Sequence, residues 1–221
     1  NGKNNLAVHL SNVGESSRWY PGAGLYRKVK LIVKNKESID QWGTFVTTPV
    51  VTDDLAKVNI KTKVTSENLR IVTKIKDASG NEVAVNKSDV IFGNEFDQNI
   101  AVKNPKLWSP ETPYLYTAVS QIYVGDILKD ETTTRFGIRT IKFEPNKGFS
   151  LNGKVRKFKG VCLHHDLGPI GTAINKAALR RQLTILKDMG CDAIRSSHNP
   201  ASRSLRVRRT PTARTGQASN L

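Results

Sequence analysis

Histidine and arginine side chains gather at two points near the end of the sequence. His164 and His165 follow a predicted buried strand at 158–163, and His198 follows a second one at 191–195, which ends in Arg195. In α/β barrels and open α/β sheets, active sites are built at the carboxyl ends of the strands. Imidazole and guanidinium groups there could donate hydrogen bonds to an oxygen-rich ligand. The alternative is that they only cap the strand ends by bonding loop carbonyls.

A metal site is a second interpretation of the same segment, with four candidate ligands: His164, His165, Asp166 and His198. Adjacent residues of a strand point to opposite faces, and the sequence contains neither HExxH nor CxxC, so the support is weak. The two cysteines, at 162 and 191, exclude a disulfide framework and a four-cysteine zinc site. We expect both thiols to be reduced and buried in neighbouring strands.

A helix is predicted between these two strands. Asn175 can cap its start, Gly190 can end it, and one face carries leucines at helical spacing, namely Leu179, Leu183 and Leu186. Strand, helix and strand form a βαβ unit, whose two strands must run parallel. Before it, the segment 149–154 is typical of a hairpin with an Asn-Gly turn. The unit predicts the opening of an α/β barrel.

The region from 42 to 139 is predicted to be entirely β. Turn signals separate seven candidate strands, at 44–50, 56–65, 69–76, 82–86, 98–102, 114–124 and 131–136. This spacing is typical of an immunoglobulin-like sandwich, here without cysteines. We expect its inner faces to include Val58, Ile60, Val64, Leu69, Ile71, Ile75, Leu115 and Val119.

The two ends of the chain differ from this pattern. Strands are predicted at 5–10 and 25–33, flanking a Gly/Pro-rich loop at 17–24, and they are too few to close a sheet. The chain opens with Asn1, so we expect its natural N-terminus to be missing. Residues 201–221 hold five arginines and no acidic residue and have the composition of a disordered segment.

The formal net charge of +16 first suggests a nucleic-acid binder. No stretch combines aromatic and basic residues as a base-stacking platform would, so we expect no nucleic-acid partner. No apolar run approaches the roughly 18 residues that cross a bilayer, so we expect no membrane span. The compartment stays open between periplasm and cytoplasm.

Four motifs together resemble glycoside hydrolase family 2, most closely its β-galactosidase-like members. They are WYPGAGLYRKV at 19–29, NPKLWSPETPYLY at 104–116, FGIR at 136–139 with FSLNGK at 149–154, and the pair GVCLHH at 160–165 and AIRSSHNP at 193–200. The resemblance covers residues 1 to about 200. It implies a mainly β chain in four parts: the C-terminal part of a sugar-binding jelly roll (1–36), an immunoglobulin-like sandwich (37–140), the first βαβ unit of a (β/α)8 TIM barrel (141–200) and an aberrant basic tail (201–221).

The resemblance also implies roles for individual residues. His164 and His198 match the histidines that contact sugar hydroxyls, and Arg195 matches the arginine that supports the catalytic carboxylates. The substrate-binding residues implied are therefore His164, His198 and Arg195. The commoner family form has Asn-Arg-His-Glu where this chain has Cys162-Leu-His-His. Asn199 replaces a usual tyrosine, and Trp19 and Tyr20 could touch the sugar or only pack in their loop.

Retaining glycosidases use two carboxylates about 5–5.5 Å apart, and both are glutamates in this family. The last glutamate here is Glu144, before the predicted barrel, and of the later acids only Asp166 lies near the expected site. The resemblance therefore implies a fragment that lacks both catalytic residues and is inactive, from a parent that hydrolyses terminal β-galactosides. The alternatives are a non-catalytic carbohydrate-binding or scaffold module, or a parent of the β-glucuronidase or β-mannosidase type.

The implied partner of the parent is a β-galactoside sugar, and a homo-oligomeric parent is left open. No cofactor is implied for this fragment, although a divalent or monovalent cation is left open for the parent.

Overall fold

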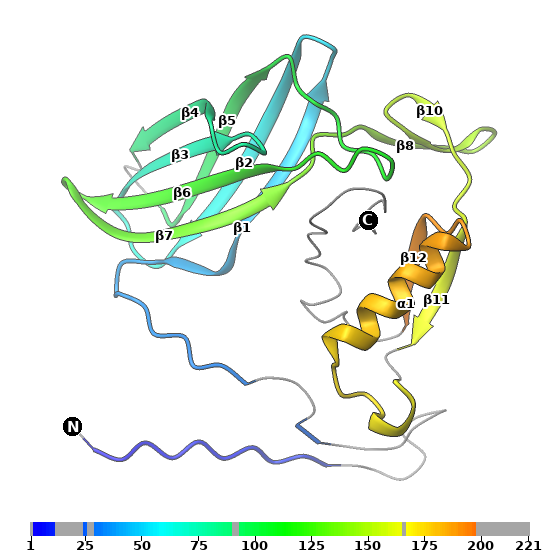
Figure 1. Ribbon diagram of the computed structural model, residues 1–221. Helices are drawn as coiled ribbons and strands as arrows, with labels where there is room; N and C mark the ends of the chain where they lie inside the picture. Colours follow the sequence, from blue (N-terminus) through cyan, green and yellow to red (C-terminus); the bar gives the residue numbers. More distant parts are fainter. Residues whose placement is uncertain (1, 12–23, 26–28, 90–92, 165–166, 198–221) are drawn as a thin grey trace.

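The computed structural model describes residues 2–11, 24–25, 29–89, 93–164 and 167–197 (Figure 1). All seven strands predicted between 42 and 139 form. Most of them are longer than the ranges predicted from the alternation of apolar and polar residues. Their bounds are β1 (Ile39–Val51), β2 (Leu55–Val64), β3 (Arg70–Lys76), β4 (Glu82–Asp89), β5 (Glu95–Lys103), β6 (Tyr116–Val124) and β7 (Ile127–Phe136).

These strands form the expected sandwich. One sheet has the order β1-β2-β5 and the other β4-β3-β6-β7, and every pairing is antiparallel. The chain crosses between the sheets after β2, β4 and β5, so each sheet mixes early and late strands (Figure 1). Alternate residues of each strand point inward and form the core, because successive side chains of a strand point to opposite faces of the sheet. The immunoglobulin-like arrangement is confirmed.

The core has two apolar clusters with a polar layer between them. Ile71 and Ile122 belong to one cluster, and Ile75 and Ala118 belong to the other. Between the two clusters lie Thr73 on β3 and Ser120 on β6, and both are buried. Thr62 of β2 and Gln98 of β5 are also fully buried in this polar layer. The hydroxyl of Thr73 donates to Gln98 Oε1 at 2.6 Å and lies 3.2 Å from Ser120 Oγ.

The inward face of β6 corrects one prediction. We expected Leu115 and Val119 to point inward, but both are only half-buried, and the buried positions are the even ones, from Tyr116 to Ile122. This strand carries apolar residues on both faces and hides Ser120 in the core, so its sequence does not mark which face is inner. Leu115 instead packs on a third cluster formed by Trp108, Phe149 and Leu151.

The predicted hairpin is confirmed as part of a small antiparallel sheet. Its strands are β8 (Ile141–Glu144), β9 (Gly148–Leu151) and β10 (Lys154–Val155), in the order β10-β9-β8. Asn152 and Gly153 make the β9–β10 turn with φ of 50° and 75°, the left-handed backbone that a tight hairpin turn requires. Because Phe149 and Leu151 share a cluster with Trp108, this sheet is packed onto the sandwich.

The βαβ unit also forms as predicted. Its elements are β11 (Gly160–His164), the short 3₁₀ helix η1 (Gly168–Ile170), α1 (Lys176–Asp188) and β12 (Ala193–Ser197). The strands β11 and β12 pair in parallel, and the side chain of Asn175 accepts hydrogen bonds from the N–H groups of Ala177 and Ala178. The described residues contain only the beginning of a barrel, which does not close.

The predicted strands at 5–10 and 25–33 are wrong as far as the structure describes them: residues 2–11, 24–25 and 29–33 form no strand. Leu6 is 85% exposed and Leu31 is 92% exposed. A strand forms only when a neighbour accepts its backbone hydrogen bonds, and the described part of 1–36 provides none. The assignment of this segment to a jelly roll therefore stays a prediction. Residues 201–221 lie outside the described residues.

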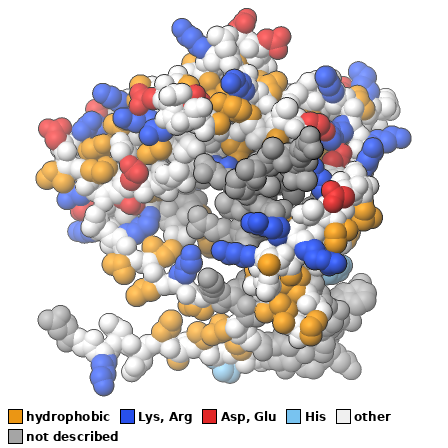
Figure 2. Space-filling model, in the orientation of Figure 1, with side chains coloured by type: hydrophobic (Ala, Val, Ile, Leu, Met, Phe, Trp, Pro, Cys, Tyr) orange, Lys and Arg blue, Asp and Glu red, His pale blue; other side chains and the backbone are white. Residues whose placement is uncertain are grey.

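Charge is unevenly distributed along the sequence. Residues 37–140 hold 12 basic and 14 acidic side chains, so the sandwich is slightly acidic and the excess of basic residues behind the net charge of +16 lies outside it. Figure 2 shows basic and acidic side chains interspersed on the visible face of the sandwich. In the described part of the chain, no helix is both long and apolar enough to span a membrane.

Candidate functional site

The register of the parallel pair decides which side chains share a face. Cys162 pairs with Arg195, and His164 pairs with Ser197, so these four side chains lie on one side of the β11–β12 sheet. His164 and Arg195 are both exposed. The sequence predicted that Arg195 ends its strand, but β12 continues to Ser197, so Arg195 lies at the centre of the strand. His164 is the last residue of β11, and the register brings both side chains onto the same face.

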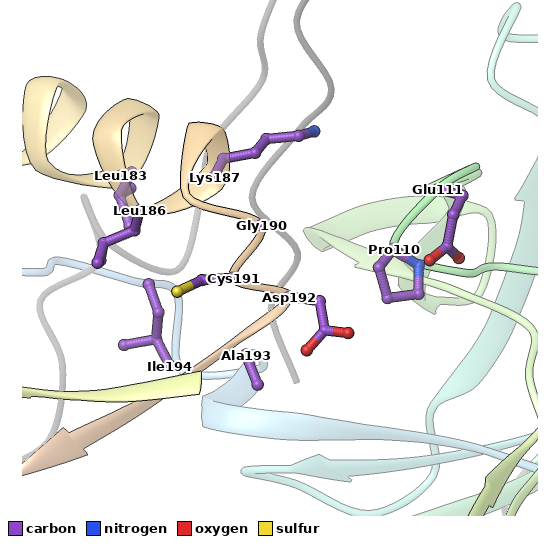
Figure 3. Close-up of a pocket in the computed structure, with 10 residues that line it drawn as sticks. All are labelled: Pro110, Glu111, Leu183, Leu186, Lys187, Gly190, Cys191, Asp192, Ala193 and Ile194. Carbon is purple, nitrogen blue, oxygen red and sulfur yellow. The ribbon is translucent and has the colours of Figure 1, made fainter. Parts of the chain in front are cut away.

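Helix α1 lies on the other face. Leu179 and Leu183 are its buried residues, and Leu183 lines one pocket together with Leu186 and Ile194 (Figure 3). Ile194 alternates with Arg195 along β12, so the helix covers the side opposite to the arginine. In a TIM barrel the helices form the outer ring, and the opposite strand face points into the barrel. His164 and Arg195 therefore occupy the face that would line a barrel interior.

The guanidinium group of Arg195 is oriented by its neighbours. Its Nη1 donates to Ser197 Oγ at 2.9 Å and lies 3.7 Å from Cys162 Sγ. Cys162 is exposed and Cys191 is only partly buried, so the expectation of two buried thiols is wrong. Both are free cysteines, as expected. Cys162 is exposed on the face that it shares with Arg195, opposite to α1, although Ser197 on the same face is buried.

Several candidate residues lie outside the described residues: His198, His165, Asp166, Asn199, Trp19 and Tyr20. The structure therefore places two of the three predicted substrate-binding residues, His164 and Arg195, and leaves His198 as a prediction. Within the described ranges, no three His, Cys, Asp or Glu side chains are grouped as metal ligands. Three of the four proposed metal ligands fall outside those ranges, so the metal interpretation stays untested.

The described acids late in the chain lie away from this face. Glu144 ends β8 and contacts Lys142 and Lys147. Asp188 is the last residue of α1, and Asp192 immediately precedes β12, at the amino end of the strand. None of these three carboxylates therefore lies at the carboxyl end of the β11–β12 pair, and Asp166, the acid expected nearest to it, lies outside the described residues.

The amino end of the pair holds an ion-pair network that the sequence did not reveal. Arg156 donates from Nη1 and Nη2 to both oxygens of Glu111, at 3.1 and 2.7 Å, and from Nε and Nη2 to Asp192 Oδ2, at 3.2 and 2.8 Å. Glu111 and Arg156 are 45 positions apart and belong to a sandwich loop and the hairpin exit, so no spacing rule links them. Only Glu111 stood within a recognised motif.

The network shifts the pKa values of its members. Hydrogen bonds from Arg156 lower the pKa of Glu111 from 4.5 to about 2, although partial burial opposes this. Burial of Asp192 works to raise its pKa, but the bonds from Arg156 and from the Lys159 N–H outweigh it and the pKa is lowered. The two carboxylates in turn raise the pKa of Arg156. All three groups are therefore charged at neutral pH.

A pocket adjoins this network between the sandwich loop and the end of α1. Pro110 and Glu111 line one side, and Lys187, Cys191 and Asp192 are among the residues on the other (Figure 3). It lies at the amino end of β12, where barrels keep residues for stability, whereas catalytic groups lie at the carboxyl end. We therefore assign the pocket to the contact between the two structural units.

Comparison with known proteins decides the family. The model for glycosyl hydrolases family 2 matches residues 37–139, and the model for the family's TIM barrel domain matches residues 142–206. The chain belongs to glycoside hydrolase family 2. The barrel match extends to residue 206, a few residues beyond the limit of about 200 that the motifs indicated.

Relatives in family 2 carry two different activity names. A β-galactosidase of Bacteroides ovatus is 44% identical over 207 residues, covering 89% of this chain and 24% of that protein. A β-glucuronidase of Streptococcus agalactiae is 31% identical over 190 residues, covering 86% of this chain and 30% of that protein. A crystal structure of a family 2 member from Bacteroides cellulosilyticus superposes with a TM-score of 0.78 at 38% identity, covering 87% of this chain and 28% of that one. The chain thus spans about a quarter of the length of these relatives.

Proposed function

We propose that this chain is the sandwich and barrel-opening part of a family 2 glycosidase that hydrolyses terminal β-galactosides. The observation that carries the proposal is that His164, the last residue of β11, and Arg195, two residues before the end of β12, are exposed on one shared face of the strand pair. There they would donate hydrogen bonds to sugar hydroxyls, together with His198. The 44% identity to the β-galactosidase of Bacteroides ovatus favours galactose as the sugar.

A β-glucuronide is the second candidate substrate. A relative from Formosa agariphila that is named a putative β-glucuronidase is 40% identical over 201 residues, and the β-glucuronidase of Streptococcus agalactiae is 31% identical, against 44% for the β-galactosidase. The exposed guanidinium group of Arg195 could pair with the carboxylate of a uronic acid, because a guanidinium fork matches a carboxylate. The lower identity makes this the less favoured candidate.

Hydrolysis would need carboxylates that these 221 residues do not supply. Retaining chemistry uses a nucleophile and an acid/base group about 5–5.5 Å apart. The sequence has no glutamate after Glu144, and Asp166 alone cannot take both roles. We therefore propose that the chain by itself turns over no glycoside and that its residues contribute binding only.

Two experiments test these proposals. The purified chain is incubated with a chromogenic β-galactoside and a β-glucuronide, and we expect no turnover above background for either. Turnover that His164→Ala and Arg195→Ala both abolish would contradict the absence of catalysis.

The second experiment replaces the matching quarter of the Bacteroides ovatus enzyme with this sequence. We expect the chimaera to hydrolyse the β-galactoside and to lose about a hundredfold in kcat/KM on Arg195→Ala, the value of a hydrogen bond from a charged donor, and about tenfold on His164→Ala. Arg180→Ala, an exposed arginine on α1, is the matched control and should have no effect. Full activity after both substitutions would refute the sugar-contact role, and a preference for the β-glucuronide would select the second candidate.

A further inference from the structure

The amino ends of β11 and β12 are joined by more than the parallel ladder. The Lys159 N–H donates to Asp192 Oδ1 at 2.9 Å, and the Asp192 N–H donates to Lys159 O at 2.8 Å. These bonds immediately precede the first register pair, Gly160 with Ala193. The backbones are close at that point, since a Cβ on Gly160 would meet Ala193 O at 2.8 Å. Asp192 therefore links the amino ends of the two strands through hydrogen bonds to Lys159.

Arg156 connects Asp192 to the rest of the protein. Its side chain bonds Asp192 Oδ2, the oxygen that Lys159 leaves free, and it also bonds both oxygens of Glu111 on the sandwich loop. Its backbone N–H donates to Phe149 O at 2.8 Å, which fixes the residue to the hairpin. Phe149 packs in turn against Trp108.

The two halves of the network are not equally strong. The side chains of Arg156 and Asp192 are 23% and 17% exposed, whereas that of Glu111 is 62% exposed. Water screens an exposed pair and reduces its contribution, so the bond to Asp192 matters more than the bond to Glu111. The stronger half is the one that reaches the strand pair.

We infer that Arg156 and Asp192 are positioning residues that set the register of β11 and β12, and so the face on which His164 and Arg195 stand. A slip of one residue in a strand would turn each of its side chains to the other face. The ladder has five register pairs and only two strands, which is too little to hold a register strongly by itself. The relevance to sugar binding rests on the proposed function, whereas the register-setting role does not.

The first test is amide hydrogen exchange on the full 221-residue chain, which needs no substrate. In Arg156→Gln and in Asp192→Asn, we expect exchange at 160–164 and 193–197 to quicken by about tenfold, since local openings become easier. The sandwich amides serve as the internal control and should not change. Glu111→Gln should have a smaller effect, and Arg156→Lys an intermediate one, because an ammonium group cannot bond both carboxylates as a fork does.

The control is Arg70→Gln, which makes the same change of residue type at a more exposed ion pair, to Asp126, elsewhere on the chain. We expect it to leave β11 and β12 unchanged. The double variant Arg156→Gln/Asp192→Asn should quicken exchange no more than the stronger single variant, because both changes break the same link. Additive effects would show that the two residues act separately and would overturn the inference.

The second test observes the positioned side chains directly. NMR signals of the His164 ring and the Arg195 guanidinium should shift in Arg156→Gln and not in Arg70→Gln. The inference fails if exchange in both amino-end variants stays within about twofold of the unmodified chain. It also fails if exchange quickens while the His164 and Arg195 signals stay in place. Failure of the chimaera to hydrolyse β-galactosides would refute the proposed function and leave these measurements unaffected.

Discussion

Arg195 and Cys162 lie directly opposite each other in the parallel pair, with Arg195 Nη1 3.7 Å from Cys162 Sγ. The thiol is exposed on the face that carries His164, whereas Cys191 is partly buried beside the end of α1. The reactivity of each cysteine therefore measures access to a different side of the same strand pair.

Cys162 should react with a thiol reagent faster than Cys191, because access limits the reaction of a free thiol. The measurement is labelling by a maleimide in the folded protein, read by mass spectrometry of the peptides. Cys162→Ser and Cys191→Ser identify each site. Equal or reversed rates would contradict the exposed position of Cys162, and full labelling of both in denaturant without reductant should confirm that neither is oxidised.

The sandwich should fold without the barrel segment. Both of its main apolar clusters lie within 37–140, from Ile39 to Ile138. About 100 residues are enough for an independent core. We expect this span alone to unfold in one cooperative denaturant transition and residues 150–221 alone to show none. A cooperative transition in the latter piece would contradict this prediction.

Ile60→Ala should destabilise the sandwich by about 2–5 kcal/mol, because Ile60 is fully buried in the larger cluster and truncation leaves a cavity. The free energy of unfolding from urea titration measures the effect. Val85→Ala, at an exposed position of β4, is the control and should change stability by less than about 0.5 kcal/mol. Similar losses for the two variants would show that the burial pattern is wrong.

Thr73→Val should cost about 1–3 kcal/mol although it keeps the shape of the side chain, because it removes the donor to Gln98 Oε1 inside the core. Thr133→Val, on an exposed position of β7, is the matched control and should be nearly neutral. If Thr73→Val is also neutral, the polar layer between the two apolar clusters makes no net contribution to stability.

Acid should weaken the Arg156 network. The pKa of Glu111 is lowered in the folded state from 4.5 to about 2, so its contribution is complete above pH 4.5 and is lost as the pH falls toward 2. Asp192, whose pKa is also lowered, changes in the same direction. A ¹³C NMR titration of the Glu111 carboxyl group should find the lowered pKa, and Arg156→Gln should return it toward its ordinary value. A pKa above 4 with Arg156 intact would contradict the bidentate contact.

Local patterns in the sequence determined most of the elements. Alternation marked all seven sandwich strands, and a capping asparagine, a leucine face and a final glycine marked α1. These signals are local, since a strand has period two and a helix ends where its backbone groups find caps. The same patterns put His164 and Arg195 on consecutive parallel strands, and four motifs taken together along residues 1 to about 200 indicated family 2.

Tertiary structure alone decided the faces and the distant contacts. The inner side of β6 could not be predicted because Ser120 is buried while Val119 is not, and only the opposite sheet makes that choice. The strands expected before residue 36 failed because a strand depends on a partner for its hydrogen bonds. Cys162 is accessible because α1 covers the other side of its strand. Arg156 meets Glu111 and Asp192 across 45 and 36 positions, and only the packing of the hairpin between the sandwich and the first barrel strands brings those charges within bonding distance.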